Sequence, residues 1–238
     1  ASFAGINVPA GNGDDIGVAL AMVKSKKLIS QLMMKETFLA NLMAAKSWNM
    51  QNNLLIYDAK IFDQDKKQWT RKVSLPFGKI PSSQEAILVF NNHVSVSQDK
   101  KNNLVTLRVR HISPEVAQQW SLWIVQEVNG LLANLKAKES QASIDYLNNQ
   151  IKVTPYAELR TMFYELIQET TQSMMLAKVN VEYALTTIDP PLVPEIKSGP
   201  KRALICILGT LLGGMLSILT ILIRHLVFKK DDEFNFFI

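Results

Sequence analysis

Few residues of this chain have the types and the spacing that catalysis requires. Its three histidines, His93, His111 and His225, are far apart in the sequence and form no H-E-x-x-H or other metal-binding spacing. The sequence also lacks the G-x-x-x-x-G-K-S/T loop that cradles nucleotide phosphates and the G-x-S-x-G turn that carries a nucleophilic serine. We therefore predict no catalytic residue, no cofactor and no metal site, and a protein that is not an enzyme.

The carboxylates and the cysteine indicate no particular chemistry either. Asp145, Glu158 and Glu165 lie on predicted helix surfaces, where solvated charges are common, so a glycosidase pair stays open but nothing favours it. Cys206 is the single cysteine and lies inside an apolar run, which rules out a disulfide within this chain and a cysteine zinc cluster. The structural elements therefore carry more information than the reactive side chains.

The apolar run from Ala203 to Ile223 is the strongest structural signal in the sequence. About 20 apolar residues in a helix cross roughly 30 Å of hydrocarbon. Large apolar side chains cover every side of the helical wheel here, whereas a core helix of a soluble domain keeps a polar face. We predict a transmembrane helix over residues 201–224. Basic residues flank both of its ends, so charge alone leaves the orientation undecided.

Small residues within this helix form a predicted packing face. Gly209 and Gly213 make a G-x-x-x-G element, and Gly214 extends it. Such glycines let a second transmembrane helix approach closely, although glycine is common in spanning helices in general. We predict that this face packs against a helix of another segment or another subunit.

Four prolines precede the helix, at Pro190, Pro191, Pro194 and Pro200. Each fixes φ near about −65° and prevents a continuous helix. We interpret them as a stiffened approach to the membrane. An ordinary juxtamembrane linker is the alternative, and mechanics alone leaves it open.

Composition limits the class of protein. Of the 238 residues, 200 precede the predicted transmembrane helix, which suits one domain or two small ones. The net charge is +5, and the lysines and arginines are spread along the chain rather than gathered in a stripe. Nucleic-acid binding therefore has weak support.

The periodicity of the first part of the chain predicts an α+β base over residues 1–113. We expect two helices before residue 44, separated at Lys24–Lys27, and a short helix over Glu85–Asn92 with Ser82 or Ser83 as its N-cap. Alternating residues on both sides of a polar turn predict a β-hairpin over residues 94–109, the core of a small β-sheet.

Two long helices should follow and form an extended helical arm over residues 114–180. Ser113-Pro114-Glu115 and Thr154-Pro155 each begin a helix, because Ser or Thr caps a free amide and Pro fits the first turn. The predicted apolar stripes are Ala117, Trp120, Ile124, Val128, Leu131 and Leu135 on one helix and Leu159, Phe163, Leu166, Thr170, Met174 and Ala177 on the other. We expect these two helices to form an antiparallel hairpin. Residues 181–188 should then return as a strand to a membrane-proximal base. This strand begins the segment of residues 181–200, which ends in the proline-rich approach to the membrane.

The C-terminal residues resemble a known family. Asp189-Pro190-Pro191, Pro194-Glu195 and Pro200-Lys201-Arg202, followed by Leu208-Gly209 and Gly213-Gly214-Met215-Leu216, are similar to the second transmembrane segment of Wzz-type polysaccharide co-polymerases, the chain-length determinants. His111-Ile112-Ser113-Pro114 with Gln119-Trp120, and Ser143-Ile144-Asp145-Tyr146-Leu147, resemble the family's passage from strand to long helix.

The resemblance implies a role and a topology. Its members are non-catalytic homo-oligomeric rings of the Gram-negative inner membrane that set the length of a surface polysaccharide, such as the lipopolysaccharide O-antigen, made by a Wzy-type polymerase. It places residues 1–200 in the periplasm and residues 225–238 in the cytoplasm as a tail. The expected partners are further copies, the polymerase, membrane lipid and the growing lipid-linked polysaccharide.

One departure from the family is large. Members begin with a cytoplasmic tail and a first transmembrane helix, and neither is found in this sequence, so we expect a fragment or a truncated gene. The alternatives are a single-span periplasmic sensor or adaptor, or a regulator of another glycan such as enterobacterial common antigen or capsule. The polysaccharide, its modal length and the number of subunits stay open.

Overall fold

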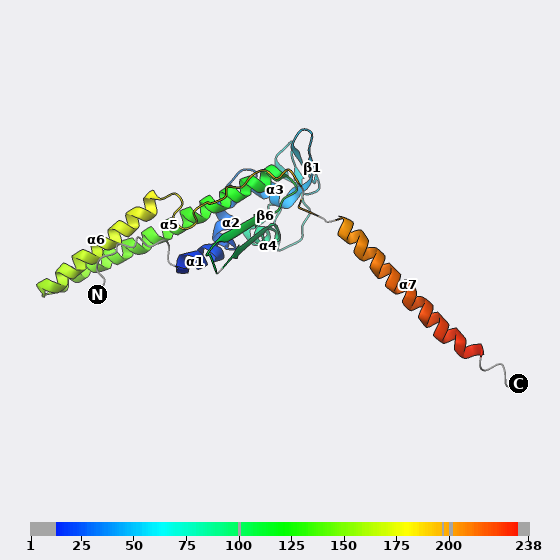
Figure 1. Cartoon of the computed structure of the whole chain (residues 1–238). Helices are drawn as coiled ribbons and strands as arrows, with labels where there is room; N and C mark the ends of the chain where they lie inside the picture. Colours follow the sequence, from blue (N-terminus) through cyan, green and yellow to red (C-terminus); the bar gives the residue numbers. More distant parts are fainter. Residues whose placement is uncertain (1–12, 100, 197, 200–201, 233–238) are drawn as a thin grey trace. The chain divides into compact units, whose positions relative to one another are not determined.

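The chain mixes helices with short antiparallel strands, as the periodicity predicts. The computed structural model describes residues 13–99, 101–196, 198–199 and 202–232 (Figure 1). It divides into two units, Ala1–Val193 and Pro194–Ile238. The elements of the first unit are, in order, α1 (Gly13–Val23), α2 (Lys26–Leu32), α3 (Phe38–Ala44), β1 (Ala45–Asn49), β2 (Leu54–Tyr57), β3 (Phe62–Asp63), β4 (Gln68–Trp69), α4 (Ser83–His93), β5 (Val94–Gln98), β6 (Val105–Val109), α5 (Pro114–Val153) and α6 (Ala157–Val179).

The core of the first unit forms around the N-terminal half of α5. Trp120 is fully buried, and its ring centroid lies 4.9 Å from that of Phe38 on α3 and 6.5 Å from that of Phe90 on α4. The predicted stripe of α5 is confirmed where it meets this core, because Ala117, Trp120, Ile124, Val128 and Leu131 are all buried. Their spacing of three and four residues places them on one helix face.

Local capping explains where the helices of the core begin. The Oγ of Ser113 accepts a hydrogen bond from the Val116 amide, and Pro114 occupies the first turn of α5, as predicted. Ser82 caps α4 and forms a reciprocal capping box with Glu85. The N-terminal region differs from the prediction, because the second expected helix ends at Leu32 and the chain turns before α3 begins at Phe38. That turn brings Phe38 to the Trp120 ring.

The predicted β-hairpin is confirmed, but it belongs to no larger sheet. β5 and β6 pair antiparallel, with Val94 opposite Val109, and their apolar residues pack against the core while Arg108 is exposed. Among the described residues, the strands form three separate two-stranded sheets, β1–β2, β3–β4 and β5–β6. Each is a hairpin with its own turn, so the first unit contains small antiparallel sheets, as expected, but they do not join into one.

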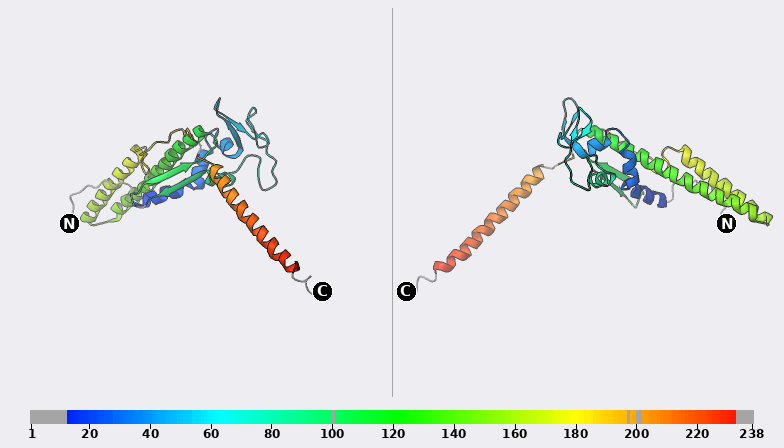
Figure 2. Two further views of the ribbon diagram at one scale, coloured as in Figure 1. Left: turned by 45° about the vertical axis from the view of Figure 1, so that its right-hand side comes forward. Right: turned by 180° about the vertical axis from the view of Figure 1, so that it is seen from behind.

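The predicted antiparallel helical hairpin is confirmed. α5 contains 40 residues, which corresponds to about 60 Å of helix, and α6 lies along its distal half (Figures 1 and 2). The connection lies at Thr154, as predicted, although α6 begins at Ala157 rather than at Pro155. The stripe of α6 is only partly correct, because Ala177 is buried whereas Leu159 and Leu166 are 41% and 45% exposed.

Residues 181–188 do not form the strand that we predicted. The return segment, defined as residues 181–193, contains neither helix nor strand, and Val181 and Ile188 are 81% and 77% exposed. Tyr183, Ala184 and Leu185 pack against the core. The backbone groups of Ala184 and Leu185 bond to a side chain of α5 instead of to a neighbouring strand, so the segment cannot extend a sheet.

The second unit contains, among its described residues, one helix, α7 (Arg202–Asp232). Its residues Ala203–Arg224 are long and apolar enough to cross a membrane, with a mean hydropathy of 2.3. The predicted limits of 201–224 match this stretch closely, but the helical backbone continues to Asp232 into the predicted tail.

Replacing Trp120 tests whether its ring area or its polar atom matters. Within the described residues, the Trp120 Nε1 is buried without a hydrogen-bond partner. An unpaired buried donor lowers the stability of the folded state. We expect Trp120→Ala to lower the free energy of unfolding by about 3–5 kcal/mol and Trp120→Phe by only about 1–2 kcal/mol, because phenylalanine removes the unpaired donor. Urea unfolding of the detergent-solubilised chain, followed by circular dichroism, measures both. Equal losses would contradict this account.

Candidate functional site

The titratable groups that could do chemistry are dispersed. Among the described residues, no group of three or more histidine, cysteine, aspartate or glutamate side chains is placed to hold a metal ion. Asp145 on α5 and Glu158 and Glu165 on α6 are all exposed on helix surfaces. The structure therefore brings no carboxylate pair of the predicted set into an enclosed site.

His93 and His111 lie together, which we did not predict. Their ring centroids are 6.2 Å apart, and the ring of His111 lies 5.0 Å from that of Trp120. The Nδ1 of His93 lies 2.8 Å from the carbonyl oxygen of Arg110, and the Nε2 of His111 lies 3.1 Å from that of Asn41, so each of these nitrogens carries a proton. The signal in the sequence was the hairpin register, since Val94 opposite Val109 brings their flanking residues together.

This histidine pair connects backbone segments rather than facing a substrate cavity. The amide of Ser113 donates to the Nδ1 of His111, which fixes its neutral tautomer, and burial lowers the pKa of His111. The side-chain oxygen of Asn41 accepts a hydrogen bond from the Tyr57 hydroxyl, and burial raises the pKa of Tyr57. These contacts join α3, β2 and the start of α5. We interpret them as structural.

A shallow depression of about 380 Å³ lies beside the start of α5. Its lining comes from the β1–β2 hairpin and from the N-terminal turns of α5: Asn53, Leu55, Ser113, Glu115, Val116, Gln118, Gln119 and Leu122. Glu115 is its single carboxylate and no histidine lines it, so it lacks the two groups that acid–base catalysis usually combines. Its wall includes Gln118, which binds the return segment.

Asn129 is the side chain that fixes the return segment on α5. It is 1% exposed, its Nδ2 donates to the carbonyl of Leu185 at 2.9 Å, and its Oδ1 accepts from the amides of Ala184 and Leu185 at 3.0 and 2.8 Å. One side chain thus imitates the donor and the acceptor of a neighbouring strand. Such a buried amide is costly unless it is fully paired, so its position is sharply specified.

Gln118 provides a second attachment near the end of the return segment. Its Nε2 donates to the carbonyl of Pro191 at 2.9 Å. Asn129 and Gln118 are 11 residues apart on α5, which places them about 20° apart around the helix and therefore on one face. Because Asn129 binds residue 185 and Gln118 binds residue 191, the return segment runs antiparallel to α5. Neither amide was recognised from the sequence.

The predicted proline-rich approach is divided between the two units. Pro190 is exposed and Pro191 is half-buried beside Gln118. Pro194 is exposed in the second unit, and Pro200 lies outside the described residues. The attachment of the Pro191 carbonyl shows that the first two prolines belong to the return segment.

The three predicted glycines of the packing face lie in the middle of α7. A Cβ placed at Gly209, Gly213 or Gly214 meets no described atom within 4 Å, apart from the adjoining residues and backbone of its own helix. The hydroxyls of Thr210 and Ser217 donate to carbonyls of their own helix. This face is therefore sterically open, and its pairing with another helix stays a prediction.

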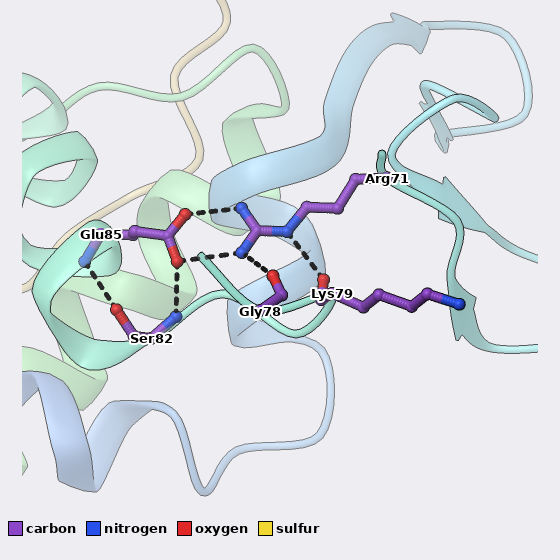
Figure 3. Close-up of polar contacts among 5 residues, drawn as sticks. All are labelled: Arg71, Gly78, Lys79, Ser82 and Glu85. Carbon is purple, nitrogen blue, oxygen red and sulfur yellow. Dashed lines mark hydrogen bonds and ion pairs between the residues drawn. The ribbon is translucent and has the colours of Figure 1, made fainter. Parts of the chain in front are cut away.

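Arg71 closes the neck of the loop that connects β4 to α4 (Figure 3). Its Nη1 and Nη2 donate to the two carboxylate oxygens of Glu85 at 2.6 and 2.9 Å. Its Nε and Nη2 also donate to the carbonyls of Lys79 and Gly78 at 2.7 and 2.5 Å. We call this set of bonds the Arg71 clamp. It holds the loop against the first turn of α4, where Glu85 also accepts from the Ser82 amide.

The clamp is electrostatically strong and poorly exposed. The side chains of Arg71 and Glu85 are 11% and 16% exposed. The hydrogen bonds from Arg71 hold the pKa of Glu85 at about 2, well below its ordinary value of 4.5, and the carboxylate in turn raises the pKa of Arg71. A two-pronged guanidinium–carboxylate pair fixes orientation as well as charge.

Loss of the Asn129 amide should release the return segment. We expect Asn129→Leu to accelerate hydrogen exchange at the amides of Ala184 and Leu185 by roughly tenfold or more, the factor for about 1.4 kcal/mol of local stability. Gln118→Leu is the matched control, since it removes the bond to Pro191 alone and should leave these two amides unchanged. Unaltered exchange in Asn129→Leu would show that the segment is held by other contacts.

The Arg71 clamp should weaken in acid. Because the folded-state pKa of Glu85 is depressed, its contribution is fully present above about pH 4.5 and is lost as the pH falls towards 2. We expect Glu85→Gln to unfold more easily than the native chain at pH 7 and the gap to close by about pH 2. Thermal unfolding across this range measures the gap, and a constant gap would exclude Glu85 as its source.

No family model and no curated protein matches the sequence of this chain. Its function must therefore be inferred from its own residues and from their arrangement.

Proposed function

We propose that this chain is a non-catalytic regulator of surface-polysaccharide chain length in the inner membrane of a Gram-negative bacterium. The glycan is the lipopolysaccharide O-antigen, and the regulator acts with a Wzy-type polymerase. The observation that carries the proposal is the return segment, which connects a long helical hairpin to a single apolar helix through Asp189-Pro190-Pro191. These are the residues on which the resemblance to Wzz-type co-polymerases chiefly depends.

The proposed topology assigns residues 1–200 to the periplasm, residues 201–224 to the membrane and residues 225–238 to the cytoplasm. The apolar stretch Ala203–Arg224 supports the spanning part. In this arrangement residues 1–113 form the membrane-proximal base and residues 114–180 form the arm. Eight residues separate Val193, the last residue of the return segment, from Arg202, where α7 begins.

A homo-oligomeric ring is supported by apolar side chains that the first unit leaves exposed. On α6, Leu159, Met162 and Leu166 are 41%, 55% and 45% exposed, and their spacing places them on neighbouring positions of one helix side. An exposed apolar band of this kind is typical of a surface that packs against another chain. A second copy is the proposed occupant, and it would gather the arms around a common axis.

Such a regulator would act through geometry rather than through bond chemistry. The ring of arms would limit how much lipid-linked polymer is accommodated, while the glycine face of α7 contacts a helix of the polymerase or of another copy. Small residues allow close helix approach in lipid, where packing rather than hydrophobicity drives association.

Enlarging the glycine face tests the proposed function. In a strain that lacks the corresponding full-length gene, complementation should restore a modal cluster of glycan lengths on a gel. The same gene carrying Gly209→Leu and Gly213→Leu should lose or shift that cluster, since two leucines prevent close helix packing. Met215→Phe is the control, because it adds bulk on the opposite side of the helix.

Three results separate the possibilities. Loss of the modal cluster with polymerisation retained supports regulation. Loss of all polymer without the gene indicates an enzyme or a transporter instead. An unchanged ladder in the double glycine variant contradicts the proposed contact.

A further inference from the structure

We infer that residues 72–80, the apolar loop, bind the surface of the lipid bilayer as a second membrane contact in addition to α7. This inference rests on the proposed function only in taking α7 as a membrane-spanning helix. The ligand is a bilayer that contains anionic lipid, and the loop contacts its headgroups and the outermost part of its acyl chains.

The apolar loop exposes large side chains that a soluble surface would normally cover. Leu75, Phe77 and Ile80 are 94%, 52% and 65% exposed, and Val73 is 40% exposed. All four lie within eight consecutive residues, so they form one local group rather than scattered surface residues. Phe and Leu side chains of this kind are typical of segments that lie in the interfacial zone of a membrane.

Basic residues surround these apolar side chains. The stretch from residue 70 to residue 84 contains Arg71, Lys72 and Lys79 and no aspartate or glutamate. Arg71 is paired with Glu85 in the clamp, which leaves the two lysines to face solvent. Lysines that flank an apolar tip favour the negative surface of a bilayer that contains anionic lipid.

The Arg71 clamp prepares the apolar loop for this contact. It joins the carbonyls of Gly78 and Lys79 to the first turn of α4, and the amide of Phe77 donates to the carbonyl of Ser74 at 3.1 Å (Figure 3). Four backbone polar groups of the loop are therefore paired before it meets lipid, which lowers the cost of approaching hydrocarbon. The clamp also fixes the loop, so little conformational entropy is lost on binding.

Chain connectivity keeps a bilayer within reach of this loop. Nine residue steps join Val193 to Arg202 and extend over at most about 32 Å. Pro191 is attached to Gln118 near the N-terminal end of α5. The connection between β4 and α4, which contains the loop, lies at this same end of the first unit, opposite the tip of the α5–α6 hairpin (Figures 1 and 2).

A second copy of the chain is the other occupant that the apolar loop could have. Lys72 and Lys79 are the charged residues of the loop, and their positive charge matches the surface of a bilayer that contains anionic lipid. The charge of the loop therefore favours lipid, and the experiment separates the two occupants.

Cysteine-attached fluorescent probes measure the environment of the apolar loop in the full chain. The chain is reconstituted into vesicles of phosphatidylethanolamine and phosphatidylglycerol, and an environment-sensitive probe is attached at one position at a time. Cys206→Ser with Leu75→Cys places the probe on the loop, and Leu75 is 94% exposed, so its replacement removes no core contact. Cys206→Ser with Val153→Cys is the control, at a residue that is 72% exposed at the end of α5. The native Cys206 carries the probe in α7.

The inference predicts that spin-labelled lipid quenches the probe at position 75 at least roughly twofold more than the probe at position 153. Dissolved iodide should quench the probe at position 153 more than the probe at position 75. Replacing phosphatidylglycerol by phosphatidylcholine should reduce the lipid quenching at position 75 by roughly twofold or more. Lys72→Gln with Lys79→Gln should reproduce that loss in vesicles that contain phosphatidylglycerol.

Each contrary result has its own meaning. Equal iodide quenching at positions 75 and 153 overturns the inference, because the loop then lies in water. Protection from iodide without lipid quenching also overturns it and assigns the loop to a contact between copies. A water-exposed probe at Cys206 contradicts the proposed function instead, whereas a lipid-exposed Cys206 with a water-exposed loop leaves that function intact.

Discussion

The burial of Trp120 is the interaction on which the rest of the first unit depends. Its ring contacts Phe38 on α3, Phe90 on α4 and His111 beyond β6, so one side chain of α5 orients three other parts of the chain. The bonds of His93 and His111 to backbone carbonyls then fix the ends of the β5–β6 hairpin around this ring. Because α5 continues from this core to Val153, the direction of the whole helical hairpin is determined at its first three turns.

Regular periodicity and capping are local, and for that reason they were predictable from the sequence. The stripe through Trp120 and Val128, the Ser113-Pro114 start and the break at Thr154 all depend on residues within a few positions of one another. The apolar stretch of α7 is local in the same sense. The stripe of α6 was less accurate, because a helix that packs against one partner needs only a narrow buried face, and Leu159 and Leu166 fall outside it.

Contacts between distant side chains and backbone carry no comparable signal. Asn129 binds residues 55 and 56 positions away, and Gln118 binds one 73 positions away. An asparagine in a helix is usually solvated, so nothing in the sequence distinguished Asn129 from its neighbours. The predicted strand over residues 181–188 failed for the same reason, since the segment bonds to a distant side-chain amide and not to a neighbouring strand. Arg71 and Glu85 likewise meet only because the chain folds back over 14 residues.

The return segment also has a mechanical consequence. Asn129 and Gln118 hold the return segment antiparallel to one face of α5. A force that pulls Val193 along α5, towards the N-terminal end of that helix, therefore acts parallel to the return segment. The bonds at the two amides would then be stretched together, in shear, instead of being unzipped one at a time. Shear loading shares force among bonds, so the return segment can transmit such a tension into the core.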